Sequence, residues 1–182
     1  MTKKNKEQFQ QVILPHLDAA YNYAFWLARN RHDAEDLTQE AFSRALAAFT
    51  TFKHTNPRAW LLTIVRHAFL NHQQQTKRRG EVVYLDNVNS VAPEHPAFEH
   101  HDTPEHQLLQ QAEKDRLYAA LNKLPDDFRE IIILRELEGF SYDELAQILD
   151  CAIGTVMSRL ARARDKLRTI LQTTLHVTEY NA

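Results

Sequence analysis

The stretch SYDELAQILDCAIGTVMSRLARARDKLR, from Ser141 to Arg168, decides which fold is expected for the C-terminal half of this chain. Ser141 and Glu144 can form a capping box, in which each side chain bonds the backbone N–H of the other residue, so a helix is predicted to begin here. Apolar residues recur at helical spacing as far as Leu149, and a second helix follows a tight turn. Two short helices with arginine gathered on the second are typical of a helix-turn-helix that reads DNA.

The second helix of this motif has two distinct sides. Its apolar stripe consists of Val156, Leu160, Ala163, Leu167 and Leu171, which places Thr155, Ser158, Arg162 and, at the edge, Arg159 on the other side. Guanidiniums bond guanine in the major groove and hold phosphates, as hydroxyls also do, so these four residues are predicted to contact DNA. The later Arg164, Lys166 and Arg168 have a simpler explanation, because basic side chains near a helix end offset the helix dipole.

The charges are segregated along the 182 residues, although the net charge is only −2. Residues 41–80 contain seven Lys or Arg and no Asp or Glu, whereas residues 81–113 contain seven acids and no Lys or Arg. Basic segments supply the sequence-independent part of DNA affinity by neutralising phosphates. The acidic segment is expected to lie in a basic channel, or over the basic DNA-binding faces when DNA is absent.

The acidic segment also divides the chain. Residues 80–102 are rich in proline and scattered acids and have little apolar periodicity, so they are predicted to form a flexible acidic linker. The predicted fold class is all-α, with two small helical domains, residues 1–79 and 103–175, the second of which contains the helix-turn-helix. In that second domain Pro125 is predicted to start a helix that Gly139 ends.

Three helical stretches are predicted in the N-terminal domain. The first runs from Phe9 to Ala28, and Pro15 is expected to separate or kink its first turn. Asp33 is predicted to cap the second helix. Asn56 is predicted to cap the third, with Pro57 at the first helical position, where the missing N–H of proline costs nothing.

The chain resembles the extracytoplasmic-function (ECF) sigma factors, the small two-domain members of the sigma-70 family that direct bacterial RNA polymerase to particular promoters. The resemblance rests on LPDDFREIIILRELEGFSYDELAQILDCAIGTVMSRLARARDKLR (Leu124 to Arg168), and on DAEDLTQEAFSRALAAF with NPRAWLLTIVRHAFLNHQQQTKRR (Asp33 to Arg79). The string GTVMSRLARAR is close to the family's own signature. The resemblance implies a sigma factor that binds core polymerase and promoter DNA, has no catalytic residues, and is commonly held by an anti-sigma factor.

The resemblance also implies roles for residues of the first domain. Asp36, Gln39 and Glu40 share one edge of the second helix and match the block that grips the clamp helices of the polymerase's largest subunit; for the neighbouring Asp33 and Glu35, complementing the helix dipole is the simpler explanation. The residues expected to hold the minus-10 element, including a base flipped from the non-template strand, are Lys53, His54, Asn56, Thr63, Arg66, His67 and Asn71.

In the second domain the resemblance implies contacts with the minus-35 element. Ser141 and Arg135 join the four residues of the second helix in this set, and a surface salt bridge from Arg135 to Glu136 or Glu138 is the alternative. Ala152 stands where the family usually has a hydroxyl cap for the recognition helix, a loss of about 1 kcal/mol.

Two other classes of DNA-binding protein are alternatives to a sigma factor. A free-standing transcription regulator, with a helical ligand-binding or dimerisation domain, would also use the helix-turn-helix, but it leaves the basic stretch 52–79 unexplained. A recombinase or other DNA enzyme would need a nucleophile with an acid/base cluster, and the N-terminal half offers no such arrangement. The chain is therefore not expected to be an enzyme.

Composition limits cofactors and location. A single cysteine excludes an internal disulfide framework and a cysteine-based zinc site. Four histidines in or beside the linker could bind a metal, but without a scaffold they are expected to be solvated, so no metal and no other cofactor is predicted. No apolar run is long enough to span a bilayer and no signal peptide is recognisable, which predicts a cytoplasmic protein that does not insert into membranes.

Overall fold

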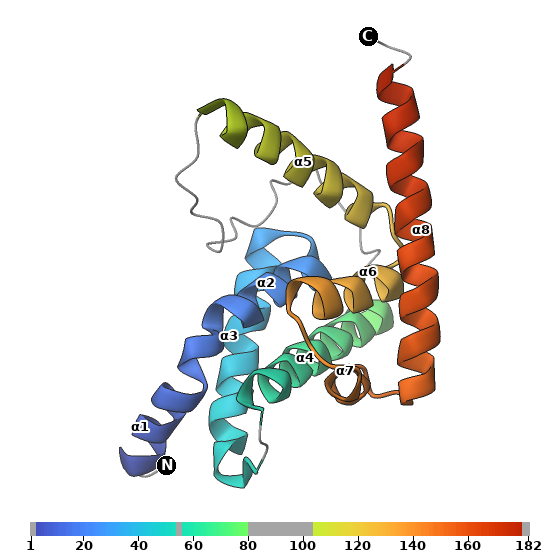
Figure 1. Ribbon diagram of the computed structural model, residues 1–182. Coiled ribbons are helices and arrows are strands. Elements are labelled where there is room, and N and C mark those ends of the chain that lie inside the picture. The colour runs from blue at the N-terminus through green and yellow to red at the C-terminus, as the bar shows by residue number, and fades with distance from the viewer. Residues whose placement is uncertain (1–2, 54–55, 80–103, 180–182) are drawn as a thin grey trace.

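The computed structural model describes residues 3–53, 56–79 and 104–179, and every regular element within these ranges is helical (Figure 1). In the N-terminal half the elements are α1 (Lys3–Val12), the 3-10 turn η1 (Leu14–His16), α2 (Leu17–Ala28), α3 (Arg31–Ala48), the 3-10 turn η2 (Phe49–Thr51) and α4 (Pro57–Arg79). In the C-terminal half they are α5 (Pro104–Asn122), α6 (Asp126–Ile132), the π-helical turn η3 (Ile133–Leu137), α7 (Tyr142–Leu149) and α8 (Ile153–Glu179). The predicted all-α class is confirmed.

Helices α2, α3 and α4 pack against one another to form the core of the N-terminal half. Ala24, Ala34 and Ala41 are buried where these helices meet, and α4 contributes Leu61 and Val65. Small side chains at the contacts let the helix axes approach closely, since the interaxial distance depends on the residues between them.

The predicted break at Pro15 and the predicted start of the third helix are confirmed, whereas the first helix begins at Lys3 and not at Phe9. Pro15 lies in η1, which separates α1 from α2. Asn56 caps α4, because its Oδ1 accepts a hydrogen bond from the Ala59 amide at 3.1 Å, and Pro57 is the first helical residue.

The predicted cap of α3 is wrong. The cap is Asn30, whose Oδ1 accepts from the Asp33 amide at 2.8 Å, and Asp33 lies inside the first turn. The reason is the preceding residue: Arg29 ends α2 in the left-handed conformation, with φ 63°, so the next helix begins earlier than the acidic residue suggested. The carboxylate of Asp33 instead accepts from Asn30 Nδ2 at 2.7 Å.

The helix-turn-helix forms as its capping pattern predicted. Ser141 Oγ accepts from the Glu144 amide at 3.3 Å, and the Ser141 amide donates to Glu144 Oε2 at 2.8 Å. The hydroxyl of Ser141 also donates to that carboxylate at 2.9 Å, so this predicted DNA contact is already used by the helix cap. Gly139, with φ 72°, ends the preceding helix in a conformation that disfavours other residues. The methyl group of Ala152 offers no acceptor to the first turn of α8.

The two halves lie against each other. Helix α7 packs on α4 and α6 on α2, and Figure 1 shows the orange α6 and α7 beside the green α4. One continuous hydrophobic cluster includes Leu62 of α4 together with Phe140 and Leu145 of the C-terminal half. The predicted linker, residues 80–102, lies outside the described residues.

Candidate nucleic-acid interface

The outer side of α8 carries the residues predicted to read DNA. Thr155, Ser158 and Arg162 are exposed, and Arg159 is half-buried at the edge of the apolar stripe, as the helical spacing predicted. Ser158 Oγ donates to the Thr155 carbonyl at 3.1 Å, and Arg162 Nε donates to the Ser158 carbonyl at 3.2 Å. Met157 is 53 % exposed beside them and was missed, although an apolar side chain here can contact a thymine methyl group.

Arg135 forms neither of the salt bridges considered for it. Its Nη1 donates to the Phe140 carbonyl at 2.6 Å, and its guanidinium lies 4.9 Å from the centroid of the Tyr142 ring. Both carboxylates are engaged elsewhere, Glu136 with α8 and Glu138 with α4. Arg135 therefore holds the turn between η3 and α7, and the salt-bridge alternative is wrong.

The acidic edge of α3 is open to solvent. Asp36, Gln39 and Glu40 are all exposed, and an open groove between α2 and α3 runs beside Gln39. Glu40 Oε1 accepts from Arg44 at 2.6 Å, one helical turn away, and Asp36 lies 3.7 Å from His32. Exposed ion pairs contribute little stability, so these carboxylates remain available to a partner.

The residues predicted for the minus-10 element lie on two sides of α4, and one side faces the C-terminal half. Asn56 Nδ2 donates to the carboxylate of Glu144 at the start of α7. Arg58, which was not predicted, donates to the carboxylate of Glu138 and, at 2.8 Å, to its carbonyl. Hydrogen bonds from Ser141 and Asn56 lower the pKa of the Glu144 carboxyl, that from the Ser141 amide most strongly.

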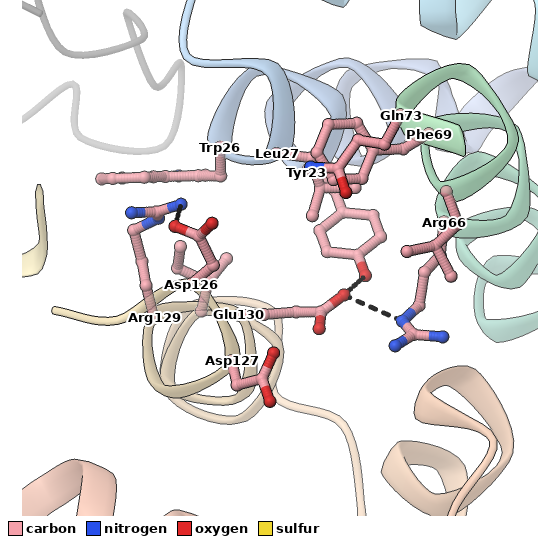
Figure 2. A pocket seen from close by; sticks show the side chains of 12 residues that line it. Tyr23, Trp26, Leu27, Arg66, Phe69, Gln73, Asp126, Asp127, Arg129 and Glu130 are labelled. Carbon is pink, nitrogen blue, oxygen red and sulfur yellow. Dashed lines mark hydrogen bonds and ion pairs between the residues drawn. The ribbon is translucent and has the colours of Figure 1, made fainter. Parts of the chain in front are cut away.

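The same side of α4 contains a buried network around Glu130 of α6 (Figure 2). Glu130 Oε1 accepts from Arg66 Nε at 3.0 Å and from the Tyr23 hydroxyl at 2.6 Å. Glu130 is only 9 % exposed, and Tyr23 is 1 % exposed. Burial, reinforced by the negative charge of Glu130, raises the pKa of the Tyr23 phenol well above its ordinary value, so the phenol remains a donor.

A second cluster extends this contact. Arg29, which follows α2, and Arg129 of α6 both donate to Asp126 Oδ1, at 2.6 and 2.9 Å. The Arg129 side chain is buried, its Nη1 has no hydrogen-bond partner among the described residues, and Figure 2 shows its guanidinium beneath the Trp26 ring. Burial, with repulsion from Arg29, lowers the pKa of Arg129. A cavity of about 130 Å³ lies between Asp126 and Arg129 on one side and Arg66 on the other.

The other side of α4 lines an open groove. The groove measures about 460 Å³ and is lined by Arg44 and Ala48 of α3 and by Ile64, His67, Leu70, Asn71 and Gln74 of α4. In this groove the exposed side chains of His67 and Asn71 lie beside the guanidinium of Arg44, which comes from α3. Arg44 was missed because helical spacing relates residues within one helix and cannot indicate which neighbouring helix faces them.

The remaining predicted minus-10 residues are separate from this groove. Lys53 is exposed, and Thr63 is half-buried with its hydroxyl donating to the Ala59 carbonyl at 2.9 Å. His54 lies outside the described residues, as do most of the linker histidines.

No group of three or more His, Cys, Asp or Glu in the described part of the chain could hold a metal ion. Among these same residues, no helix has the length and apolar character needed to cross a membrane.

Comparison with known proteins identifies both halves. Residues 12–79 match the family model of sigma-70 region 2, and residues 114–167 match that of sigma-70 region 4. The ECF RNA polymerase sigma factor EcfG of Rhodopseudomonas palustris is 39 % identical over 91 % of this chain and 86 % of its own length. The ECF RNA polymerase sigma factor SigE of Mycolicibacterium smegmatis is 34 % identical over 90 % of this chain, which spans only 61 % of that relative.

The fold is similar to that of solved sigma factors. The sigma factor RpoE from Bartonella quintana, crystallised in complex with the anti-sigma factor NepR, aligns with a TM-score of 0.71 and 35 % identity over 91 % of this chain and 98 % of that one. Both sigma-70 regions are therefore present in order, on a fold that a sigma factor of similar sequence shares. The chain belongs to the extracytoplasmic-function sigma factors of RNA polymerase.

Proposed function

We propose that this protein binds core RNA polymerase and directs it to particular promoters. The observation that carries the proposal is the presence, on one chain, of an exposed acidic edge on α3 and an exposed cationic side on α8. The acidic edge of α3 lies within sigma-70 region 2, which would bind polymerase, and the cationic side of α8 lies within sigma-70 region 4, which would bind DNA. The protein supplies no catalytic step, since polymerase performs the chemistry, and it acts in the cytoplasm, where polymerase is found.

The roles divide between the halves. Residues 1–79 would bind polymerase through Asp36, Gln39 and Glu40 and would melt and hold the minus-10 element with α4. Residues 103–175 would bind the minus-35 element with α8, and residues 80–102 would connect the two. Opening DNA costs unstacking energy, which a cationic groove with room for an extruded base recovers without ATP.

An anti-sigma factor is the third proposed partner. The related RpoE was crystallised with one, and the structure of CnrH, whose fold is similar at a TM-score of 0.62 and 24 % identity, contains the cytosolic domain of CnrY. We infer that a protein of this kind restrains the present chain.

Run-off transcription with purified core polymerase tests the proposal. The double variant Arg159→Ala, Arg162→Ala should lose transcription from a promoter that needs its minus-35 element and still bind core. Asp36→Ala with Glu40→Ala should lose core binding. Arg168→Ala, which removes an exposed arginine further along α8, is the control and should do neither.

The outcome that would contradict the proposal is also specific. A protein that binds promoter DNA tightly by itself and never associates with core polymerase is not acting as a sigma factor. Circular dichroism of each variant establishes that the loss of one activity does not reflect loss of the fold.

A further inference from the structure

Three carboxylates of the C-terminal half bind the side of α4 that is proposed to hold promoter DNA. Glu130 pairs with Arg66, and Glu138 pairs with Arg58. The third, Glu144, accepts from the amide of Asn56. Carboxylate oxygens take the same donors that phosphate and base oxygens would take.

These contacts are too well buried to coexist with bound DNA. The side chains of Arg66 and Glu130 are 16 % and 9 % exposed, and those of Arg58 and Glu138 are 33 % and 5 % exposed. Burial lowers the pKa of Arg58, with Glu144 opposing that shift, which agrees with a guanidinium that is partly shielded from water. A DNA strand can reach these groups only after α6 and α7 have moved away.

The spacing of promoter elements leads independently to the same requirement. The minus-10 and minus-35 elements are about 25 base pairs apart, which is roughly 85 Å at 3.4 Å per base pair of B-DNA. Here α7 of the helix-turn-helix is in contact with α4. A molecule in this arrangement cannot place α4 on one element and α8 on the other.

We propose that the C-terminal half is an intramolecular inhibitor: through Glu130, Glu138 and Glu144 it occupies the promoter-holding side of α4, and the free protein must open before it can bind the minus-10 strand. This inference rests on the proposed function, because it takes α4 to be the DNA-holding helix. It goes beyond that function because it gives three acidic residues of the C-terminal half a second role: in the free protein they occupy the hydrogen-bond donors that promoter DNA would bind.

The interface offers two independent ways to open the molecule without altering a proposed DNA contact. Glu130→Gln with Glu138→Gln removes two negative charges from the C-terminal side. Tyr23→Phe removes the hydroxyl that donates to Glu130 and leaves every charge in place. The charge-matched control is Glu136→Gln with Asp143→Asn, since Asp143 is exposed and Glu136 pairs within its own half, with α8.

Two measurements on the full-length protein test the proposal. Small-angle X-ray scattering reports opening without DNA, and fluorescence anisotropy with labelled single-stranded DNA of mixed sequence at low salt reports access to α4. Apparent affinity falls in proportion to the open fraction, and a lost hydrogen bond to a buried charge changes such an equilibrium by about tenfold or more. Both opening variants should therefore expand and bind DNA about tenfold more tightly than wild type, and the control should do neither.

The contrary results are distinct from one another. Opening variants that expand but bind DNA no more tightly would overturn the proposal, as would a wild-type protein that is already expanded. Run-off transcription by wild type with core polymerase separates this failure from that of the proposed function. If wild type initiates while the opened variants gain no DNA affinity, only the inhibition is wrong. If wild type never initiates with core, the proposed function fails and the inhibition with it.

Discussion

The hydroxyl of Tyr23 should contribute strongly to the stability of the protein with its two halves packed together. Tyr23→Phe keeps the buried ring and removes only the hydrogen bond of 2.6 Å to Glu130. The acceptor is charged and nearly buried, so water does not replace the lost donor, and the free energy of unfolding should fall by about 1.5–3 kcal/mol. For a protein of this size that corresponds to a decrease in Tm of about 3–12 °C.

Thermal unfolding followed by near-ultraviolet circular dichroism measures this loss, and α2 supplies a matched control. Tyr21→Phe removes a hydroxyl from a tyrosine whose ring packs beside Phe25 and whose hydroxyl bonds no residue in the described part of the chain. A double-mutant cycle of Tyr23→Phe with Glu130→Ala should show a coupling of about 1 kcal/mol or more. Equal losses for the two tyrosines, or simple additivity in the cycle, would refute the assigned hydrogen bond.

The other predictions concern the caps and turns. The pKa of Glu144 is lowered in the folded state, so its stabilising contribution is fully present above the ordinary value of 4.5 and is lost as the pH falls through the lower folded value. Chemical denaturation should accordingly show that Glu144→Gln is less stable than wild type near neutral pH and that the difference shrinks in acid. Ala152→Ser should add about 1 kcal/mol by capping α8, seen as a higher denaturation midpoint, and an unchanged midpoint would mean that the hydroxyl does not cap. Gly139→Ala should cost about 1 kcal/mol because its φ is 72°, whereas Gly154→Ala, in the first turn of α8, should be neutral or stabilising; equal effects would contradict this.

Much of the interface was predictable because it depends on spacing within single helices. The exposure of Ser158 and Arg162 followed from the apolar stripe of α8, and that of Asp36 and Glu40 from the register of α3. The misplaced cap at Asp33 shows the limit of such reasoning, since the left-handed backbone of Arg29, not side-chain type, determined where α3 begins.

The contacts that sequence reasoning did not predict depend on how the helices pack and on how the chain turns between them. The outward position predicted for Arg66 is wrong, because its side chain is 16 % exposed and pairs with Glu130 of α6. Its contact with the minus-10 element stays a prediction. The salt bridge considered for Arg135 is wrong, because its guanidinium bonds the Phe140 carbonyl in the turn before α7. Its contact with the minus-35 element stays a prediction. The periodicity of a single helix indicates neither the path of the turn after η3 nor which helix packs on α4.

The sequence by itself determined the all-α class, the helix-turn-helix and the side of each helix that is apolar, because capping and helical periodicity are local properties of the chain. Only the tertiary structure decided that the two halves pack together and that Glu130, Glu138 and Glu144 occupy the donors of α4. The physical reason is that a guanidinium binds a carboxylate or a phosphate equally readily. The same sequence pattern therefore predicts a DNA contact or an internal ion pair, and the packing of the two halves selects between them.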